Sequence, residues 1–228
     1  MIGYYAIAIV FMLISALVGQ VLKSRFKRYT KIPLGRSGKQ VAEQMLQANG
    51  IYDVRIVPTQ GQLSDHYNPT TKTVALSEDV YYGQHVSAAA VAAHECGHAV
   101  QHAKAYAPLK MRSALVPLQN VSAKILNFMF IGMFIGLATV QSFMDIALPV
   151  FIISYAILTL VSFVTLPVEI DASRRALAWL ANSGVTNYSN HSQAKDALKW
   201  AAYTYVVAAS SSLATLLYFI LMFLARRE

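Results

Sequence analysis

Hydrophobic positions along the chain fall into four long runs, which are separated by segments of mixed character. The first run, Ile2 to Leu22, contains no charged residue. Leu126 to Phe143 and Ile146 to Leu166 are separated only by a short break around Asp145, and Tyr203 to Ala225 lies close to the last residues. A helix needs about 20 apolar residues to span a bilayer. The pattern therefore predicts four transmembrane helices, the middle two forming a hairpin whose tip lies at Asp145.

Shorter segments with the periodicity of helices or strands lie between these runs. "SGKQVAEQMLQANGI" predicts an amphipathic helix with Ser37 near its start and Gly50 as its stop. "YDVRIVPTQG" predicts a strand, and "LSDHYNPTTKTVALSEDVY" predicts two short strands around a turn that begins at Asn68. The alanine-rich stretch "SAAAVAAHECGHAVQHA" predicts a helix that is capped by Ser87. A further helix is expected to start at Pro167, directly after the third apolar run.

Composition agrees with a membrane protein. Hydrophobic residues make up 56% of the chain and charged residues only 13%, whereas a soluble domain has about a quarter charged residues. Aromatic and basic residues are not interleaved as in nucleic-acid-binding modules, so we expect no nucleic-acid partner. Cys96 is the single cysteine. It excludes an internal disulfide and any all-cysteine zinc site.

The positive charge is placed unevenly. The formal net charge is +8, and five basic residues lie between Lys23 and Lys31, directly after the first apolar run. Basic residues flank membrane spans on the cytoplasmic side, which predicts that this segment is cytoplasmic and that the N-terminus lies outside. Arg226 and Arg227 disagree, because four spans place them outside, so the orientation of the C-terminus stays open. Four basic residues after the third run support the assignment: Arg174, Arg175, Lys195 and Lys199.

These features predict a mainly α-helical integral membrane protein with a small β element. The first run is interpreted as an uncleaved anchor because its basic residues follow the apolar stretch instead of preceding it. We expect an N-terminal transmembrane anchor, a cytoplasmic region with the alanine-rich helix, a transmembrane hairpin, a cytoplasmic helical segment and a C-terminal transmembrane helix. In the same order, the expected boundaries are residues 1–22, 23–124, 125–166, 167–202 and 203–228.

The alanine-rich helix carries an H-E-x-x-H motif. His94 and His98 are four residues apart, so both imidazoles lie on one helix face and can bind one zinc ion. Glu95 can then accept a proton from a water molecule that zinc has made acidic. Gly97 lowers helix stability by about 1 kcal/mol relative to alanine, which indicates that another segment approaches closely there. The alternative is a pair of core histidines on a buried helix.

A catalytic zinc usually has three protein ligands. His102 lies eight residues after His94, but three histidines in line on one helix cannot all reach one ion. Glu169 in "LPVEIDASRRALAWL" is the stronger candidate, because two histidines and a glutamate from a separate helix form a known catalytic ligand set. Asp171 could orient a ligand histidine by accepting its N–H, or the two acids could exchange roles. Alternatively, both acids mark a helix N-terminus after Pro167, favoured by the helix dipole.

Three stretches carry a resemblance to a known family: "LSDHYNPTTKTVALSEDVY", "HECGHAVQHAKAYAPLKMRSALVP" and "LPVEIDASRRAL". They resemble the YugP-like neutral zinc metallopeptidases of bacterial membranes, and the resemblance covers nearly the whole chain. It implies a zincin-like membrane peptidase with His94 and His98 as zinc ligands and Glu95 as the catalytic residue. That family is similar to the HtpX-like and CAAX prenyl protease group, in which a glutamate that opens an E-x-x-A-D-like segment is the third ligand. Here Glu169 opens the segment, and Ser173 stands in the place of the aspartate.

We therefore expect a zinc-dependent, gluzincin-like endopeptidase that is embedded in the bacterial inner membrane with its site on the cytoplasmic side. Its expected partners are the lipid bilayer and a protein or peptide substrate, with membrane-proximal or misfolded proteins as candidates. The strand in "KTVALSEDVY" is a candidate edge for pairing with an extended substrate, and the alternative is a plain structural strand. The alternative function is a non-catalytic zinc-binding membrane scaffold or sensor. Glu95 argues against it, because a structural zinc site is closed by protein and needs no acid beside a water.

Overall fold

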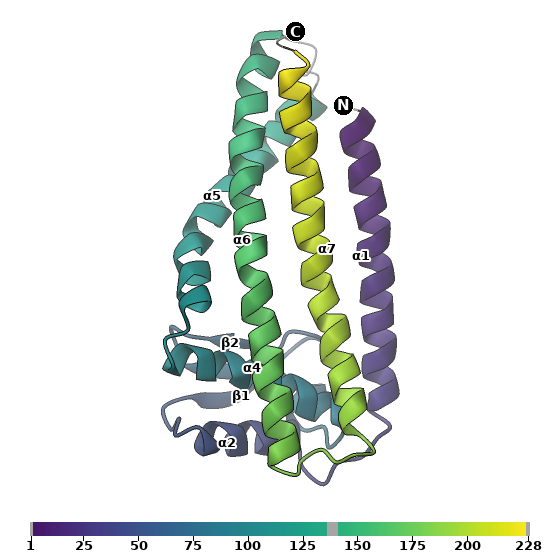
Figure 1. Cartoon of the computed structure of the whole chain (residues 1–228), viewed down its shortest axis with the longest axis vertical. Coiled ribbons are helices and arrows are strands. Elements are labelled where there is room, and N and C mark those ends of the chain that lie inside the picture. The colour runs from purple at the N-terminus through teal and green to yellow at the C-terminus, as the bar shows by residue number, and fades with distance from the viewer. Residues whose placement is uncertain (1, 136–140, 227–228) are drawn as a thin grey trace. The chain divides into compact units, whose positions relative to one another are not determined.

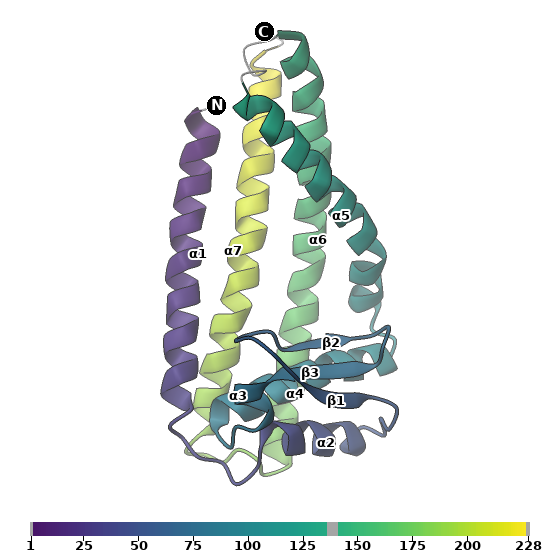
Figure 2. The same ribbon diagram turned by 180° about the vertical axis from the view of Figure 1, so that it is seen from behind.

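The computed structural model describes residues 2–135 and 141–226. Helices dominate the chain, and a small sheet lies in its first half (Figures 1 and 2). Contacts divide the chain into two compact units. The apolar unit comprises Met1–Leu17, Met111–Leu166 and Tyr205–Glu228, and the α/β unit comprises Val18–Lys110 and Pro167–Thr204. The elements, in chain order, are α1 (Ile2–Tyr29), α2 (Gly38–Ala48), β1 (Arg55–Thr59), β2 (His66–Asn68), β3 (Thr73–Ser77), α3 (Glu78–Tyr81), α4 (Val86–Ala103), α5 (Ala107–Phe134), α6 (Gln141–Asn182) and α7 (His191–Leu224).

Within the described residues, four helices are long and apolar enough to cross a membrane, which confirms the predicted fold class of a mainly α-helical protein with a small β element. In the apolar unit, the rings of Phe151 and Phe219 stack with their centroids 4.7 Å apart. Leu126 from α5 and Tyr4 from α1 pack against the same cluster. The candidate spans are Gly3–Tyr29, Ala107–Phe134, Phe143–Asn182 and His191–Leu224.

The bounds of α5 and α6 correct two sequence predictions. The sequence predicts Asp145 at the hairpin tip, but this residue lies inside α6 and pairs with Arg226 at 3.4 Å. The connection between the two helices includes residues 136–140, which lie outside the described residues. The sequence also predicts a helix start at Pro167, yet α6 continues through it (Figure 1). A proline removes one backbone hydrogen bond, and the buried valines on both sides, Val164 and Val168, keep the helix packed across that position.

The sheet of the α/β unit has the order β1-β3-β2. β1 pairs with β3 in parallel, and β2 pairs with β3 antiparallel. The strand predicted as a substrate-pairing edge is β3, and this prediction is wrong because β3 has a neighbour on each side. Figure 2 shows the three strands beside α4, and β2 and β3 both contact that helix. β2 and β1 are the edges of the sheet.

α4 is the central helix of the α/β unit, and most of its residues are buried. Its alanines allow close packing against α2, which begins with the expected cap at Ser37. The cap of α4 differs from the prediction. His85 accepts the hydrogen bond from the backbone N–H of Ala88, whereas the hydroxyl of Ser87 donates to the carbonyl oxygen of Phe26. Ser87 therefore joins α4 to α1 instead of capping α4.

Candidate metal centre

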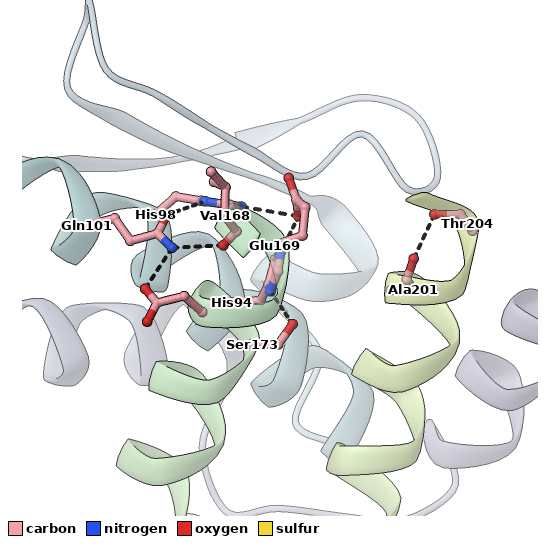
Figure 3. A network of polar contacts seen from close by, with 9 residues as sticks. His94, His98, Gln101, Val168, Glu169, Ser173, Ala201 and Thr204 are labelled. Carbon is pink, nitrogen blue, oxygen red and sulfur yellow. Dashed lines mark hydrogen bonds and ion pairs between the residues drawn. The ribbon is translucent and has the colours of Figure 1, made fainter. Parts of the chain in front are cut away.

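Three donor side chains from two helices converge in the α/β unit. His94 and His98 come from α4, and Glu169 comes from α6. Their ligand atoms all lie within 4.8 Å of one another. The Nε2 atom of His94 is 3.2 Å from Oε2 of Glu169, and that of His98 is 3.5 Å from the same oxygen (Figure 3). The structure thus brings together the three residues that the sequence suggested as ligands.

The spacing of these donors fits a zinc ion. At a tetrahedral site with metal–ligand distances of about 2.1 Å, neighbouring donor atoms lie about 3.4 Å apart. The two separations from Glu169, 3.2 and 3.5 Å, are close to this value. The donor set of two imidazoles and one carboxylate is also one that catalytic zinc sites use. The residues present therefore fit the metal.

Gly97 allows the two helices to approach each other. A Cβ atom at this position would lie 2.6 Å from the carbonyl oxygen of Ala172 on α6. Ala172 and Ala176 are themselves fully buried. Small residues at the contact bring the α4 histidines within reach of Glu169. The close approach that the glycine indicated is therefore made by the backbone of α6.

Gln101 fixes the tautomer of His98. Its amide nitrogen donates to the carbonyl oxygen of Val168 at 2.8 Å and to the carboxylate of Asp171 at 2.9 Å. Both partners are acceptors, so the amide oxygen of Gln101 must be the atom that faces Nδ1 of His98, at 3.1 Å. Nδ1 therefore carries a proton, and Nε2 is the ring atom that is directed toward the donor group. Gln101 is fully buried, which shields this network from water.

Ser173 holds the other histidine. Its hydroxyl lies 3.0 Å from Nδ1 of His94 (Figure 3). A hydroxyl can both donate and accept, so this contact orients the ring without fixing its tautomer. Ser173 occupies the place where the resemblance has an aspartate, and it contacts the histidine itself.

Asp171 contacts the donor group indirectly, through Gln101. Its carboxylate accepts hydrogen bonds from Gln101 and from Nε of Arg175, the latter at 2.6 Å. Asp171 does not join the donor group, whose third member is Glu169. The alternative of an acid pair at a helix N-terminus is wrong, because both residues lie in the interior of α6.

The surroundings of His98 favour its protonated, positively charged form. Burial alone would lower the pKa of His98, because desolvation disfavours the charged ring. The hydrogen bond to Glu169 and the charge of Glu95 oppose burial, and the pKa of His98 is raised above its ordinary value. The same negative surroundings favour a bound cation, for which the proton is a competitor.

Glu95 is almost completely buried, follows His94 directly on α4 and lies outside the donor group. His102 also lies outside it, and its Nδ1 is 2.8 Å from the hydroxyl of Tyr67 on β2. Cys96 is turned toward the carbonyl oxygen of Ala42, and burial raises the pKa of its thiol. The thiol is therefore neither a candidate ligand nor a ready nucleophile.

Comparisons with known proteins agree with this geometry. A family with the description "Putative neutral zinc metallopeptidase" matches residues 4–224. The chain belongs to this family. It is also 39% identical over 210 residues to the "Putative membrane protease YugP" of Bacillus subtilis (strain 168), an alignment that covers 91% of this chain and 90% of the relative. No solved structure matches the chain.

The sequence reasoning missed Gln101 at this candidate site, and it placed Ser173 in the motif without assigning it the contact with His94. Gln101 follows His98 by three positions on α4, and Ser173 follows Glu169 by four positions on α6. Both spacings place side chains on one helix face, so a signal was present. It was weaker than the signal of Asp171, because a carboxylate is the more familiar partner of a ligand histidine.

Proposed function

We propose that this chain is a zinc-dependent endopeptidase that hydrolyses peptide bonds in protein segments close to the membrane. One observation carries the proposal: three donor atoms within 4.8 Å of one another come from two helices. Glu95, whose charge raises the pKa of His98, does not belong to this group. Membership in a family of neutral zinc metallopeptidases supports the metal and the reaction class. Similarity to a membrane protease, together with four apolar helices, supports the membrane setting.

The chemistry follows from the roles of the side chains. Zinc would supply a Lewis acid that lowers the pKa of a water molecule and polarises the scissile carbonyl. Glu95 would accept the proton of that water and return it to the leaving amine. Gln101 keeps the Nε2 lone pair of His98 available, and Ser173 keeps the ring of His94 in place. Burial of Glu169 and Gln101 limits competing water around the donors.

The substrate would extend along β2. Strand addition at a sheet edge satisfies backbone groups of an extended peptide and positions its carbonyl. β2 pairs with β3 on one side, and no strand covers its other side within the described residues. The hydrogen bond between Tyr67 of β2 and His102 of α4 ties this edge to the helix that carries the motif. We propose that β2, and not β3, is the pairing edge.

The setting we propose is the cytoplasmic face of a bacterial inner membrane. The basic residues between Lys23 and Lys31 support this side. Glu169 follows the predicted end of the third span at Leu166 by three residues, less than one helical turn. A site so close to a span suits membrane-proximal or unfolded segments of other proteins.

Chelation with 1,10-phenanthroline tests the proposal on purified full-length protein. Two substrates of identical cleavable sequence are compared, one soluble and one attached to a transmembrane anchor in the same liposomes. We expect the chelator to abolish cleavage, zinc to restore it and magnesium to fail, because the donor set suits zinc. The anchored substrate should be cleaved faster. Cleavage that survives complete metal removal would overturn the zinc mechanism, and equal rates would overturn the membrane-proximal part alone.

A further inference from the structure

A groove between α6 and α7 in the α/β unit combines an apolar floor with a basic rim. Its volume is about 490 Å³. The rim carries three cationic side chains, Arg174, Lys195 and Lys199, and among the described residues no aspartate or glutamate lines the groove. Its floor includes Ile170, Leu177, Leu198 and Ala202. Such a combination matches a ligand that has both an anionic and an apolar part.

The cations of the rim are available for a ligand. All three side chains are exposed, and within the described residues none of them forms an ion pair. The nearest acid along α6, Asp171, is already bonded to Gln101 and Arg175. These three exposed cations are therefore accessible to an anionic ligand.

One end of the groove lies at the expected level of lipid headgroups. Ile170 and Ala202 are within about one helical turn of Leu166 and Tyr203, where the sequence predicts that the spans meet the cytoplasm. The rings of Trp200 and Tyr203 meet edge to face with centroids 5.3 Å apart, and the ammonium of Lys199 lies 5.5 Å from the centroid of Tyr203. Aromatic rings beside a basic residue are typical of the membrane interface.

We propose that this groove binds an anionic phospholipid, with its phosphate on the three cations and an apolar part against the floor. Basic pockets between membrane helices on the cytoplasmic side bind such headgroups. An acidic peptide would satisfy the cations equally well, but it gives no reason for the position of the groove beside two predicted spans. Ser173 also lines the groove, and its hydroxyl contacts Nδ1 of His94. The bound lipid therefore touches the residue that orients a candidate zinc ligand.

The test is lipid binding by the full-length chain carrying Glu95→Gln, so that it does not depend on the proposed peptidase activity. Native mass spectrometry in detergent measures binding of phosphatidylglycerol and of phosphatidylcholine. The groove variant combines Arg174→Gln, Lys195→Gln and Lys199→Gln. A matched control removes the same charge elsewhere on the α/β unit: Arg36→Gln, Lys39→Gln and Lys104→Gln.

We expect the Glu95→Gln protein and the control to prefer phosphatidylglycerol. The groove variant should bind it roughly 100-fold more weakly, given the contribution of each of the three basic residues near an anionic lipid. Two results would overturn the proposal. One is equal binding of phosphatidylglycerol by the groove variant and the control. The other concerns binding of an acidic peptide, measured for the same proteins. A groove variant that keeps its lipid binding but loses binding to this peptide would assign the groove to a polypeptide.

Discussion

At the scale of single residues, the two candidate ligand histidines are held by different means. His98 is fixed in orientation and tautomer by Gln101, whose own amide is oriented by Val168 and Asp171. His94 is oriented by Ser173, whose hydroxyl leaves the tautomer free. Because Gln101 is fully buried and Ser173 is not, a solvent molecule can replace the serine hydroxyl but not the glutamine amide.

Gln101→Leu should weaken zinc binding more than Ser173→Ala. The leucine keeps the volume but leaves Nδ1 of His98 without an acceptor, and loss of such an outer partner weakens metal binding about 10- to 100-fold. Zinc affinity is measured by competition with a chromophoric chelator, and the absorption spectrum of the cobalt-substituted protein reports the ligand geometry. Gln44→Leu on the exposed face of α2 is the control. A Gln101→Leu protein with the affinity and cobalt spectrum of the wild type would contradict the positioning role.

At the scale of elements, the site depends on the contact between α4 and α6. Gly97 is the position where a side chain would meet the backbone of Ala172, and α6 is unbroken from Gln141 to Asn182. One continuous helix therefore carries both a candidate span and Glu169. Any separation of α4 from α6 would move Glu169 away from the two histidines.

Gly97→Ala should lower both stability and zinc affinity. The added methyl group would lie 2.6 Å from a carbonyl oxygen, and such overpacking costs about 1 to 3 kcal/mol. Gly19→Ala is the matched control, because a methyl group added to that helical glycine would have no neighbouring atom within 4 Å. Thermal unfolding in detergent and zinc titration measure the two effects. Equal unfolding temperatures for the two variants would contradict the role proposed for the contact between α4 and α6.

At the scale of the whole molecule, the sequence reveals local patterns better than it reveals contacts between distant segments. The four apolar runs and the H-E-x-x-H spacing are local, so they predict the membrane helices and the site helix. The central place of β3 depends on pairing with both β1 and β2, which the composition of one strand does not encode. Pro167 carries a local signal for a helix start, and packing around it produces a continuous helix instead. Gln101 and Ser173 acquire their roles only because α4 meets α6.

The membrane orientation is a prediction at this scale, and an introduced cysteine tests it. Tyr188 is fully exposed in the connection between α6 and α7. In Tyr188→Cys, a membrane-impermeant maleimide should label the protein only after cells are permeabilised, because the segment is predicted to be cytoplasmic. The wild-type chain is the control, since Cys96 is buried and its thiol pKa is raised. Labelling of Tyr188→Cys in intact cells would reverse the proposed orientation.

In the proposed mechanism, Glu95 moves a proton at a zinc centre formed by His94, His98 and Glu169. The most direct measurement determines zinc content and peptide hydrolysis side by side for the wild type and Glu95→Gln in the same detergent. We expect both proteins to bind one zinc per chain. The glutamine variant should lose hydrolysis by at least about 100-fold, in the range that a general base contributes. A variant that cleaves as fast as the wild type would contradict the proposed role of Glu95. A wild type that binds zinc but cleaves no peptide would contradict the peptidase function and favour a structural zinc site.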